Sequence, residues 1–193
     1  MKTLNLMAAA LALAVFVAAP TPALAGKPRP APASQLATTA VAPLTDAEIA
    51  TLKWMREEEK LARDVYIELN VYWPAQIFVN IAESEQRHFD ALGAKLELYG
   101  IDDPALPGIG VFFDPELQAL HDELLALGMT SRVAALEVGV LIEETDMVDL
   151  RAAIDGTTSV PLQVTYEHLL DGSENHLASF IKELEAAGIA YEP

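Results

Sequence analysis

The chain contains no cysteine among its 193 residues. Disulfide bonds and thiolate metal ligands are therefore excluded, so any bound metal must be held by oxygen and nitrogen atoms. Basic side chains are also few, because 12 Lys and Arg stand against 29 Asp and Glu and leave a formal net charge of -17. This acidic excess repels phosphate groups, which argues against nucleic acid and anionic membrane surfaces as partners.

Several signatures of common enzyme classes are missing as well. The chain has no glycine-rich phosphate loop and no nucleophile elbow, which disfavours nucleotide-dependent and serine-hydrolase chemistry. It also has no period-two strand pattern and no internal repeat. The pattern that remains is helical, so we expect an all-α domain.

The first 25 residues have the pattern of a secretory signal peptide. Lys2 supplies a positive start, the apolar run Leu4–Ala18 is short for a membrane span, and Ala23-Leu24-Ala25 is a small-x-small cleavage motif. The alternative is an uncleaved membrane anchor. We expect cleavage near Ala25, a periplasmic or secreted product, and no membrane contact after cleavage. Residues 26–43 are rich in proline and alanine and are predicted to form an extended linker.

The folded domain is expected to span residues 44–193 and to begin with a long helix. Thr45 and Glu48 form a capping box at its start, and Trp73-Pro74 ends it. A second long helix is predicted from about Ala75 to Tyr99, before a glycine that suits a left-handed C-terminal cap. The short corner between the two helices makes them antiparallel neighbours.

A long connection separates these helices from the rest of the domain. An irregular crossover is predicted from Ile101 to Gly110, and Asp114-Pro115-Glu116 predicts a short helix that ends near Gly128. Thr130 or Ser131 caps a third long helix, and a fourth begins around Pro161. This order predicts a four-helix bundle with a long crossover that carries the short extra helix.

The first two long helices interrupt their buried apolar stripes with polar side chains. Glu85 and His88 lie three residues apart, which places them on one face of the second helix. Glu59 interrupts the stripe of the first helix. It lies 14 residues before Trp73 while Glu85 lies 12 residues after it, so at ~1.5 Å per residue the two carboxylates reach nearly the same height.

The other two long helices show the same kind of interruption. Glu143 fills the gap in the stripe of the third helix, with Glu144 on a competing stripe, and Ser173 and His176 fill the fourth. Taken alone, each such residue is ordinarily a boundary carboxylate or a hydrogen-bonded core histidine. Four interruptions at compatible heights favour a shared metal ion, because a buried carboxylate without a partner is costly. Iron suits this ligand set, with manganese or another divalent metal as alternatives.

Four segments also carry a resemblance to a known family. They resemble the signatures of a bacterial ferritin-like family catalogued as domain of unknown function 2202, and the resemblance spans the domain from Leu44 to about Gly188. The segments are Met55–Tyr66, Asn80–His88, Ile142–Asp146 and Gly172–Leu177. The resemblance implies a ferritin-like fold for the four-helix bundle.

The wider ferritin-like superfamily implies a mononuclear or dinuclear iron site that reacts with dioxygen or peroxide. The implied ligands are Glu59, Glu85, His88, Glu143 and His176. The resemblance also implies that Tyr66, seven residues after Glu59, hydrogen-bonds to this site. Further candidate ligands are Glu144 in the third helix and Glu58 if the first helix is rotated.

Ser173 departs from the superfamily pattern, because it stands where the last glutamate of the site is expected. Glu59, Glu85 and Glu143 supply only three negative charges for two divalent ions. Asp146, one turn after Glu143, or Glu144 would supply the fourth. Without such a replacement, the second metal position is expected to be weak or empty.

The remaining polar residues receive ordinary structural predictions. Glu57 and Glu58, beside Arg56 and Lys60, are predicted to lie on a solvated face with ion pairs, unless the first helix is rotated and Glu58 is a ligand. His121 and His168 are predicted at the surface or its boundary. Gly172 within the fourth helix is predicted to mark a local bulge.

Three functional hypotheses follow from the sequence. The first is a di-iron oxidoreductase, the second a metal-sequestering or delivery protein without turnover, and the third a metal-free helical interaction module.

Overall fold

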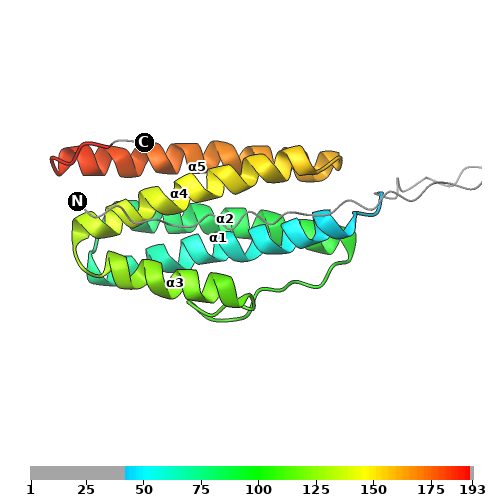
Figure 1. The fold of residues 1–193 in the computed structure, drawn as a ribbon, viewed down its shortest axis with the longest axis horizontal. Coiled ribbons are helices and arrows are strands. Elements are labelled where there is room, and N and C mark those ends of the chain that lie inside the picture. Colours follow the sequence, from blue (N-terminus) through cyan, green and yellow to red (C-terminus); the bar gives the residue numbers. More distant parts are fainter. Residues whose placement is uncertain (1–41, 192–193) are drawn as a thin grey trace, which may run out of the picture. The chain divides into compact units, whose positions relative to one another are not determined.

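The structure, a computed structural model, describes residues 42–191, and these form five α-helices and no strand (Figure 1). The predicted all-α class is confirmed for this part of the chain. The signal peptide predicted for residues 1–25 and the linker up to residue 41 lie outside the described residues. The helices are α1 (Asp46–Tyr72), α2 (Gln76–Tyr99), α3 (Pro115–Gly128), α4 (Arg132–Gly156) and α5 (Val160–Ala186).

The helix ends follow local rules that the sequence displays. The Thr45 hydroxyl accepts a hydrogen bond from the Glu48 backbone N–H at 3.2 Å, and the Glu48 carboxylate accepts one from the Thr45 N–H at 2.8 Å, so the capping box is confirmed. Gly100 ends α2 with a φ of 66°, a left-handed conformation that glycine adopts without a Cβ clash. Asp114 and Pro115 start α3 as predicted, and of the two candidate caps of α4 it is Ser131 that accepts a backbone hydrogen bond.

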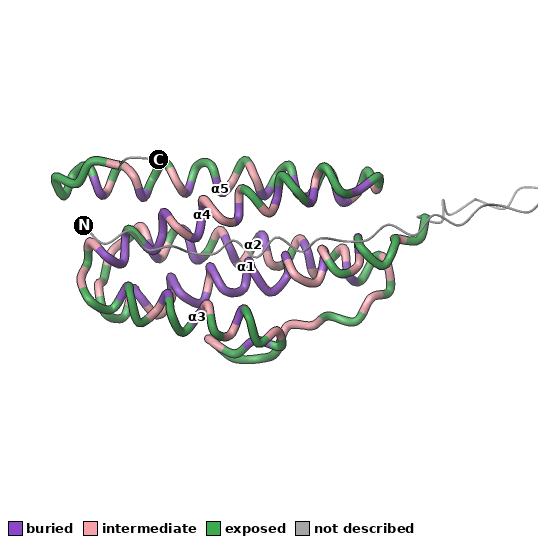
Figure 2. Tube along the Cα trace, viewed as in Figure 1, coloured by how far each residue is buried: buried purple, intermediate pink, exposed green. Residues whose placement is uncertain are grey.

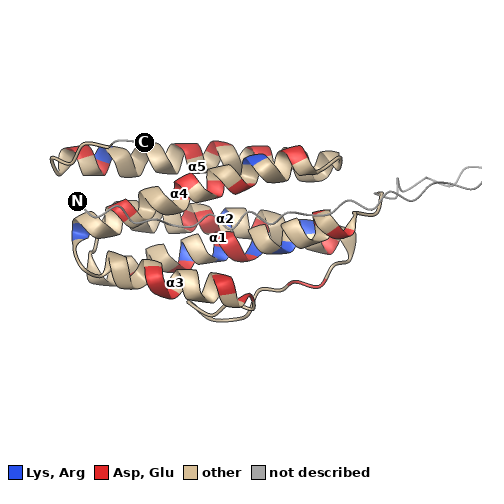
Figure 3. Cartoon of the chain, in the orientation of Figure 1, with Lys and Arg blue, Asp and Glu red and all other residues tan. Residues whose placement is uncertain are grey.

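Four of the helices pack in a closed ring. The packed pairs are α1 with α2, α2 with α5, α5 with α4, and α4 with α1, whereas α3 packs against α1 and α4. The irregular segment between α2 and α3 therefore crosses the domain and returns along α1 (Figure 1). Acidic residues are spread over all five helices, while Lys and Arg are most numerous on α1 (Figure 3). None of the described helices is both long enough and apolar enough to cross a membrane.

The apolar core is divided into two clusters. One contains Tyr66, Phe78 and Phe180, and the other contains Leu92 and Tyr166. Each of the four helices of the ring contributes residues to both clusters and carries buried polar residues between the two contributions. Figure 2 shows the buried positions along these helices. The polar interruptions of the four apolar stripes therefore lie in one layer between two apolar regions.

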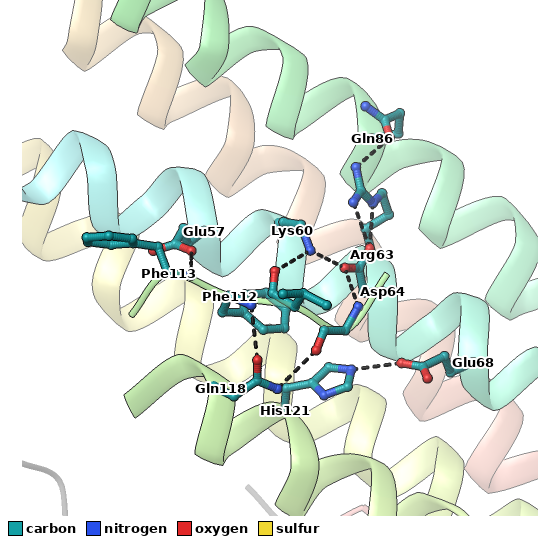
Figure 4. A network of polar contacts seen from close by, with 12 residues as sticks. Glu57, Lys60, Arg63, Asp64, Glu68, Gln86, Phe112, Phe113, Gln118 and His121 are labelled. Atoms are coloured by element: carbon teal, nitrogen blue, oxygen red, sulfur yellow. Dashed lines mark hydrogen bonds and ion pairs between the residues drawn. The ribbon is translucent and has the colours of Figure 1, made fainter. Parts of the chain in front are cut away.

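The crossover changes the environment of one face of α1. Glu57 accepts hydrogen bonds from the Phe113 and Asp114 N–H groups, at 2.6 and 3.2 Å, and Lys60 Nζ donates to Asp64 at 2.6 Å and to the Val111 carbonyl at 3.0 Å (Figure 4). The prediction of a solvated face was wrong, because the crossover and α3 cover these side chains and satisfy their polar groups.

Two further expectations need correction. His121 is 3% exposed rather than at the surface, because α3 packs its imidazole against α1, where Nε2 lies 2.8 Å from Oε2 of Glu68 (Figure 4). His168 is exposed as predicted. The bulge predicted at Gly172 is absent, since α5 is a continuous α-helix through this position. The packing described below gives this glycine a different role.

Candidate metal centre

The polar layer contains two overlapping groups of ligand side chains. Glu59, Glu85 and His88 form one group, and Glu85, Glu143 and His176 form the other. In each group, one ligand atom per residue lies within 4.8 Å of the others, and every residue is buried. The structure thus brings together the five residues that the sequence singled out, one or two from each helix of the ring. Glu85 belongs to both groups.

The two oxygens of Glu85 face different imidazoles. Oε2 lies 2.8 Å from Nδ1 of His88, and Oε1 lies 2.7 Å from Nδ1 of His176. His88 Nδ1 is also 3.2 Å from Oε2 of Glu59, and His176 Nδ1 is 3.4 Å from Oε2 of Glu143. Glu85 thus presents one carboxylate oxygen to each of the two ligand groups.

One of these short contacts lacks the alignment of a hydrogen bond. His176 Nδ1 and Glu85 Oε1 are 2.7 Å apart, yet both atoms are buried and neither has a hydrogen-bond partner. Oε1 of Glu59 is also buried and also lacks a hydrogen-bond partner. Buried polar atoms without partners are rare, because each carries a desolvation penalty of about 1–3 kcal/mol. Carboxylate and imidazole ligand atoms that converge in this way fit a divalent cation that takes the place of the imidazole protons.

Tyr66 fixes the orientation of one of these carboxylates. Its hydroxyl donates a 2.7 Å hydrogen bond to Oε1 of Glu143, so that Oε2 is the oxygen that faces His176. Glu144, the neighbouring candidate, is turned away from the cluster and accepts a hydrogen bond from Tyr191. Of the two adjacent glutamates, Glu143 therefore lies in the polar layer. The resemblance implied a hydrogen bond from Tyr66 to the ligand residues, and the structure has one, to Glu143.

Asp146 brings a fourth carboxylate to the layer. It is 6% exposed, and its Oδ2 accepts a 2.5 Å hydrogen bond from the Ser173 hydroxyl. Its other oxygen, Oδ1, is buried and has no partner. Ser173, which stands where the superfamily pattern has a glutamate, is thus paired with an aspartate from the facing helix. At this level of the layer α4 therefore carries a carboxylate where α5 carries a hydroxyl.

Burial and mutual repulsion raise the pKa values of three carboxylates in this layer. Burial and the charge of Asp146 raise the pKa of Glu59 well above its usual range, and burial with the charge of Glu85 raises the pKa of Glu143 to about 8. Burial also raises the pKa of Asp146 to about 7, against the effect of the Ser173 hydrogen bond. Burial opposes ionisation of Glu85 as well, but the two imidazoles that face it lower its pKa below the usual range.

The pKa values of the two imidazoles are also raised, by the carboxylates that face them. Burial alone would lower their pKa values, but Glu59 and Glu85 raise the pKa of His88 to about 11, and Glu143 and Glu85 raise that of His176 to about 9. The metal-free layer therefore holds protons that a bound cation would replace.

Comparisons with known proteins agree with this fold. A family model described as "Uncharacterized protein domain (DUF2202)" matches residues 48–193. The chain belongs to this family. The uncharacterized protein MJ0754 of Methanocaldococcus jannaschii is 45% identical to it over 152 residues, which are 78% of this chain and 82% of that protein. The crystal structure of hypothetical protein MJ0754 from Methanococcus jannaschii superposes with a TM-score of 0.78 at 44% identity, covering 83% of this chain and 90% of that chain.

Two residues of this DUF2202 domain were not assigned to the site from the sequence. Gly172 faces His88, since a Cβ at this position would lie 2.5 Å from Nε2 and 2.6 Å from Cε1 of the imidazole. Asp149 lies beside Glu58, whose pKa it raises together with burial and Asp146. The spacing Glu143, Asp146, Asp149 continues one face of α4 in steps of three, which is the signal that would have pointed to Asp149.

Proposed function

We propose that this protein binds two divalent metal ions, in the first place iron, inside a ferritin-like four-helix bundle. The bundle is the closed ring of α1, α2, α5 and α4, and α3 is the extra helix carried by the crossover. Support for the metal comes from the position of the ligand groups, which lie in one buried layer between two apolar clusters.

One observation carries the proposal, namely that Glu85 is shared by two complete ligand groups. An ordinary ion pair gives a carboxylate one partner, whereas Glu85 has an imidazole at each of its two oxygens. One ion would be held by Glu59, Glu85 and His88, and the other by Glu85, Glu143 and His176. With Asp146, four carboxylates would offset the four charges of two divalent ions.

Iron bound at this centre would supply the electrons needed to reduce dioxygen or peroxide. The protein's own residues hold and shield the centre. Tyr66 orients Glu143, and Tyr66, Phe78 and Phe180 pack with ring centroids 5.3 to 6.4 Å apart in the apolar cluster on one side. This packing excludes bulk water from that side, as oxidase chemistry at a buried iron centre requires.

We further propose that the protein acts after export, in a periplasmic or extracellular setting. The support is the signal-like pattern of residues 1–25. Its small partners would be metal ions and either dioxygen or peroxide, with no role for nucleic acid.

Metal content tests the proposal directly. Full-length protein loaded anaerobically with Fe(II) and desalted is expected to retain two equivalents, one for each ligand group. Glu85→Gln should lose both, whereas His88→Ala and His176→Ala should each lose one. Glu57→Gln is the matched control, because Glu57 is also buried on α1 but is bonded to the crossover. Only trace metal in the wild type, or equal loss in all four variants, would refute the metal centre.

Oxygen uptake then separates turnover from storage. After the anaerobic loading, oxygen is added and its consumption is followed together with the ultraviolet absorption of ferric iron. Consumption faster than that of the same concentration of free Fe(II) supports an oxidase. Iron that stays bound but reacts no faster than free Fe(II) would identify a sequestering or delivery protein instead.

A further inference from the structure

A cavity outside the metal centre is lined by basic side chains. It has a volume of about 420 Å³ and lies between α1, α2 and the crossover. Its walls are formed by Arg56, Lys60 and Arg63 of α1, by Phe89 of α2 and by crossover residues from Asp103 to Ile109. We call this cavity the basic pocket. Its volume lies in the range of small-molecule sites, about 300 to 1,000 Å³.

The basic pocket and the metal centre use different residues of the same two helices. Lys60 follows Glu59 on α1, and Phe89 follows His88 on α2. Consecutive residues of a helix point about 100° apart, so each helix contributes to both places with different faces. None of the residues that line the pocket belongs to the two ligand groups. An inference about the pocket therefore goes beyond the proposed function and does not depend on a bound metal.

The charge of the basic pocket is opposite to that of the chain. Three of the 12 Lys and Arg residues line it, although the net charge of the chain is -17. Arg56 pairs with Asp103 at 2.8 Å. Asp64 pairs with Lys60 at 2.6 Å and with Arg63 at 2.7 Å (Figure 4). Three positive groups thus share two carboxylates, and one further anion would balance them.

The two guanidinium groups retain donors for such an anion. Each terminal nitrogen of an arginine side chain carries two N–H groups. In the described part of the chain, Nη1 and Nη2 of Arg56 each donate one hydrogen bond, and so do Nη1 and Nη2 of Arg63. The second N–H of each nitrogen is left for another acceptor. Carboxylates suit these donors because they accept from guanidinium groups in pairs.

Phe89 holds both guanidinium groups beside one ring. Cζ of Arg56 lies 3.0 Å from the ring centroid, and Cζ of Arg63 lies 4.8 Å from it. Two hydrogen bonds from Arg63 to Oδ1 of buried Asp64, at 2.7 and 2.9 Å, fix the second group further. The donors are therefore ordered in advance, so a ligand that binds them has little side-chain entropy to remove.

Asp103 is the carboxylate with which a ligand would compete. Its side chain is 41% exposed, whereas that of its partner Arg56 is 9% exposed. A pair with one exposed partner contributes little to stability, because water solvates the carboxylate almost as well. A carboxylate of a ligand would therefore replace Asp103 on Arg56 at small cost.

The crossover side of the basic pocket is apolar. Leu106, Pro107 and Ile109 line it, and Leu106 and Ile109 are 37% and 52% exposed. Apolar side chains that remain open to solvent gain free energy when a ligand covers them. Apolar walls beside a few polar groups are the usual composition of small-molecule sites. The ligand that suits this pocket therefore joins an apolar body to an anionic group.

We propose that the basic pocket binds a small organic carboxylate with an aliphatic or aromatic body. The carboxylate accepts hydrogen bonds from Arg56 and Arg63 in place of Asp103. The body packs against Leu106 and Ile109 of the crossover. A single negative charge matches the one positive charge that the three cations and two carboxylates leave over.

A nuclear magnetic resonance titration of metal-free full-length protein with benzoate tests this proposal. The arginine Nε–H signals and the amide signals of the crossover should shift together as one site fills. Benzoate should bind about tenfold or more tightly than benzamide, which lacks the charge, and than acetate, which lacks the ring. Arg63→Gln should weaken benzoate about tenfold. Ile109→Ser, at an exposed position, should weaken benzoate about threefold and remains a test if Arg63→Gln fails to fold.

Asp103→Asn provides a sharper test, because it predicts a gain. Asparagine keeps an oxygen for the Ala105 N–H, which Oδ1 of Asp103 accepts at 3.0 Å, but it no longer pairs with the charge of Arg56. Benzoate should therefore bind about fivefold more tightly. Asp102→Asn is the matched control. It removes the same charge from the neighbouring exposed position and should change the affinity less than about 1.5-fold.

Four results would overturn the proposal. Equal affinities for benzoate and benzamide would show that the pocket does not recognise the charge, and equal affinities for benzoate and acetate would show that it does not recognise the body. Equal gains in Asp102→Asn and Asp103→Asn would leave only an effect of net charge. Absence of shifts at the pocket with benzoate in large excess would exclude the site. None of these results bears on the metal centre, because the titration uses metal-free protein.

Discussion

Ser173 on α5 donates a 2.5 Å hydrogen bond to Oδ2 of Asp146 on α4. The pair spans two packed helices and is buried, with Ser173 fully inaccessible and Asp146 6% exposed. The small hydroxyl leaves room for the aspartate, and the aspartate brings the carboxylate that α5 lacks. For the metal centre proposed above, Asp146 would therefore supply the fourth carboxylate from the helix that faces Ser173.

Ser173→Ala tests this pairing. The substitution leaves a buried carboxylate oxygen without its donor, so the metal-free protein should lose about 1–3 kcal/mol of unfolding free energy. The measurement is urea denaturation near pH 8, where Asp146, with a pKa of about 7, is largely ionised. Bound metal should reduce the loss, because it gives Asp146 another partner.

The control for this prediction is Ser179→Ala on the same helix. The exposed Ser179 hydroxyl donates to the Asn175 carbonyl four residues earlier, not to a carboxylate. Ser179→Ala should therefore change the free energy of unfolding only slightly. A loss at Ser173 that is equal with and without metal would contradict a role of Asp146 at the centre.

The raised pKa values predict how the stability of the metal-free protein depends on pH. His176 at about 9 and His88 at about 11 stay protonated above their usual 6.5, and Glu143 at about 8 stays protonated above its usual 4.5. Groups with a raised folded-state pKa stabilise the fold below the unfolded value and lose that contribution as pH rises through the folded value. The melting temperature of metal-free protein should therefore fall between pH 6.5 and 9.

Metal binding should show the complementary behaviour. Imidazoles and carboxyls must release their protons to bind a cation, so affinity should rise over the same pH interval. Calorimetry with Co(II) near neutral pH, in two buffers of different ionisation enthalpy, measures the protons released. At least the two imidazole protons should appear when both ions bind. A release close to zero would show that the imidazoles are not ligands.

Gly172→Ala should displace His88. The added Cβ would lie 2.5 Å from Nε2 of the imidazole, which is closer than non-bonded atoms approach, so the ring must rotate out of its place. The fold should remain, but affinity at the Glu59–Glu85–His88 group should fall about 10- to 100-fold, as for lost positioning contacts at other metal sites. The second ligand group should still bind, which titration calorimetry resolves.

Gly156→Ala provides the comparison, because a Cβ at this α4 position meets nothing within 4 Å. It should leave both affinities unchanged. Equal metal binding by the two glycine variants would mean that Gly172 does not position His88.

Glu48→Gln should reduce the dependence of the unfolding free energy on pH in the acid range. The Glu48 carboxylate accepts hydrogen bonds from Thr157 Oγ1 at 2.6 Å, from the Thr158 N–H and from Thr45, so it ties the start of α1 to the loop before α5. The Thr157 hydroxyl and the Thr45 N–H lower the pKa of Glu48 to about 2. Its contribution is therefore present above pH 4.5 and is lost as pH falls toward 2.

The measurement for Glu48→Gln is the urea midpoint as a function of pH. At neutral pH the variant should lose about 1 kcal/mol, as for other helix caps, and its stability should change less than that of the wild type below pH 4.5. Exposed Glu116→Gln on α3 is the control. Parallel pH curves for wild type and Glu48→Gln would contradict this assignment.

Helix periodicity located the centre well and its surroundings poorly. Glu59, Glu85 and His88 were found because each breaks an apolar stripe, and a buried polar layer leaves that trace in every helix that crosses it. Glu57 and Lys60 were misplaced because their face of α1 is covered by the crossover, an irregular segment without any period. His121 was missed for the same reason, since α3 buries it against Glu68.

The helices, their caps and the level at which each helix turns polar can be read from the chain alone, because they follow from neighbours three or four residues apart. How these levels combine depends on the packing of the helices. Packing placed Glu85 between two imidazoles and turned Asp146 toward Ser173. These contacts depend on how each helix is rotated and packed against the next. That rotation is set by the whole core and cannot be read from the period of one helix.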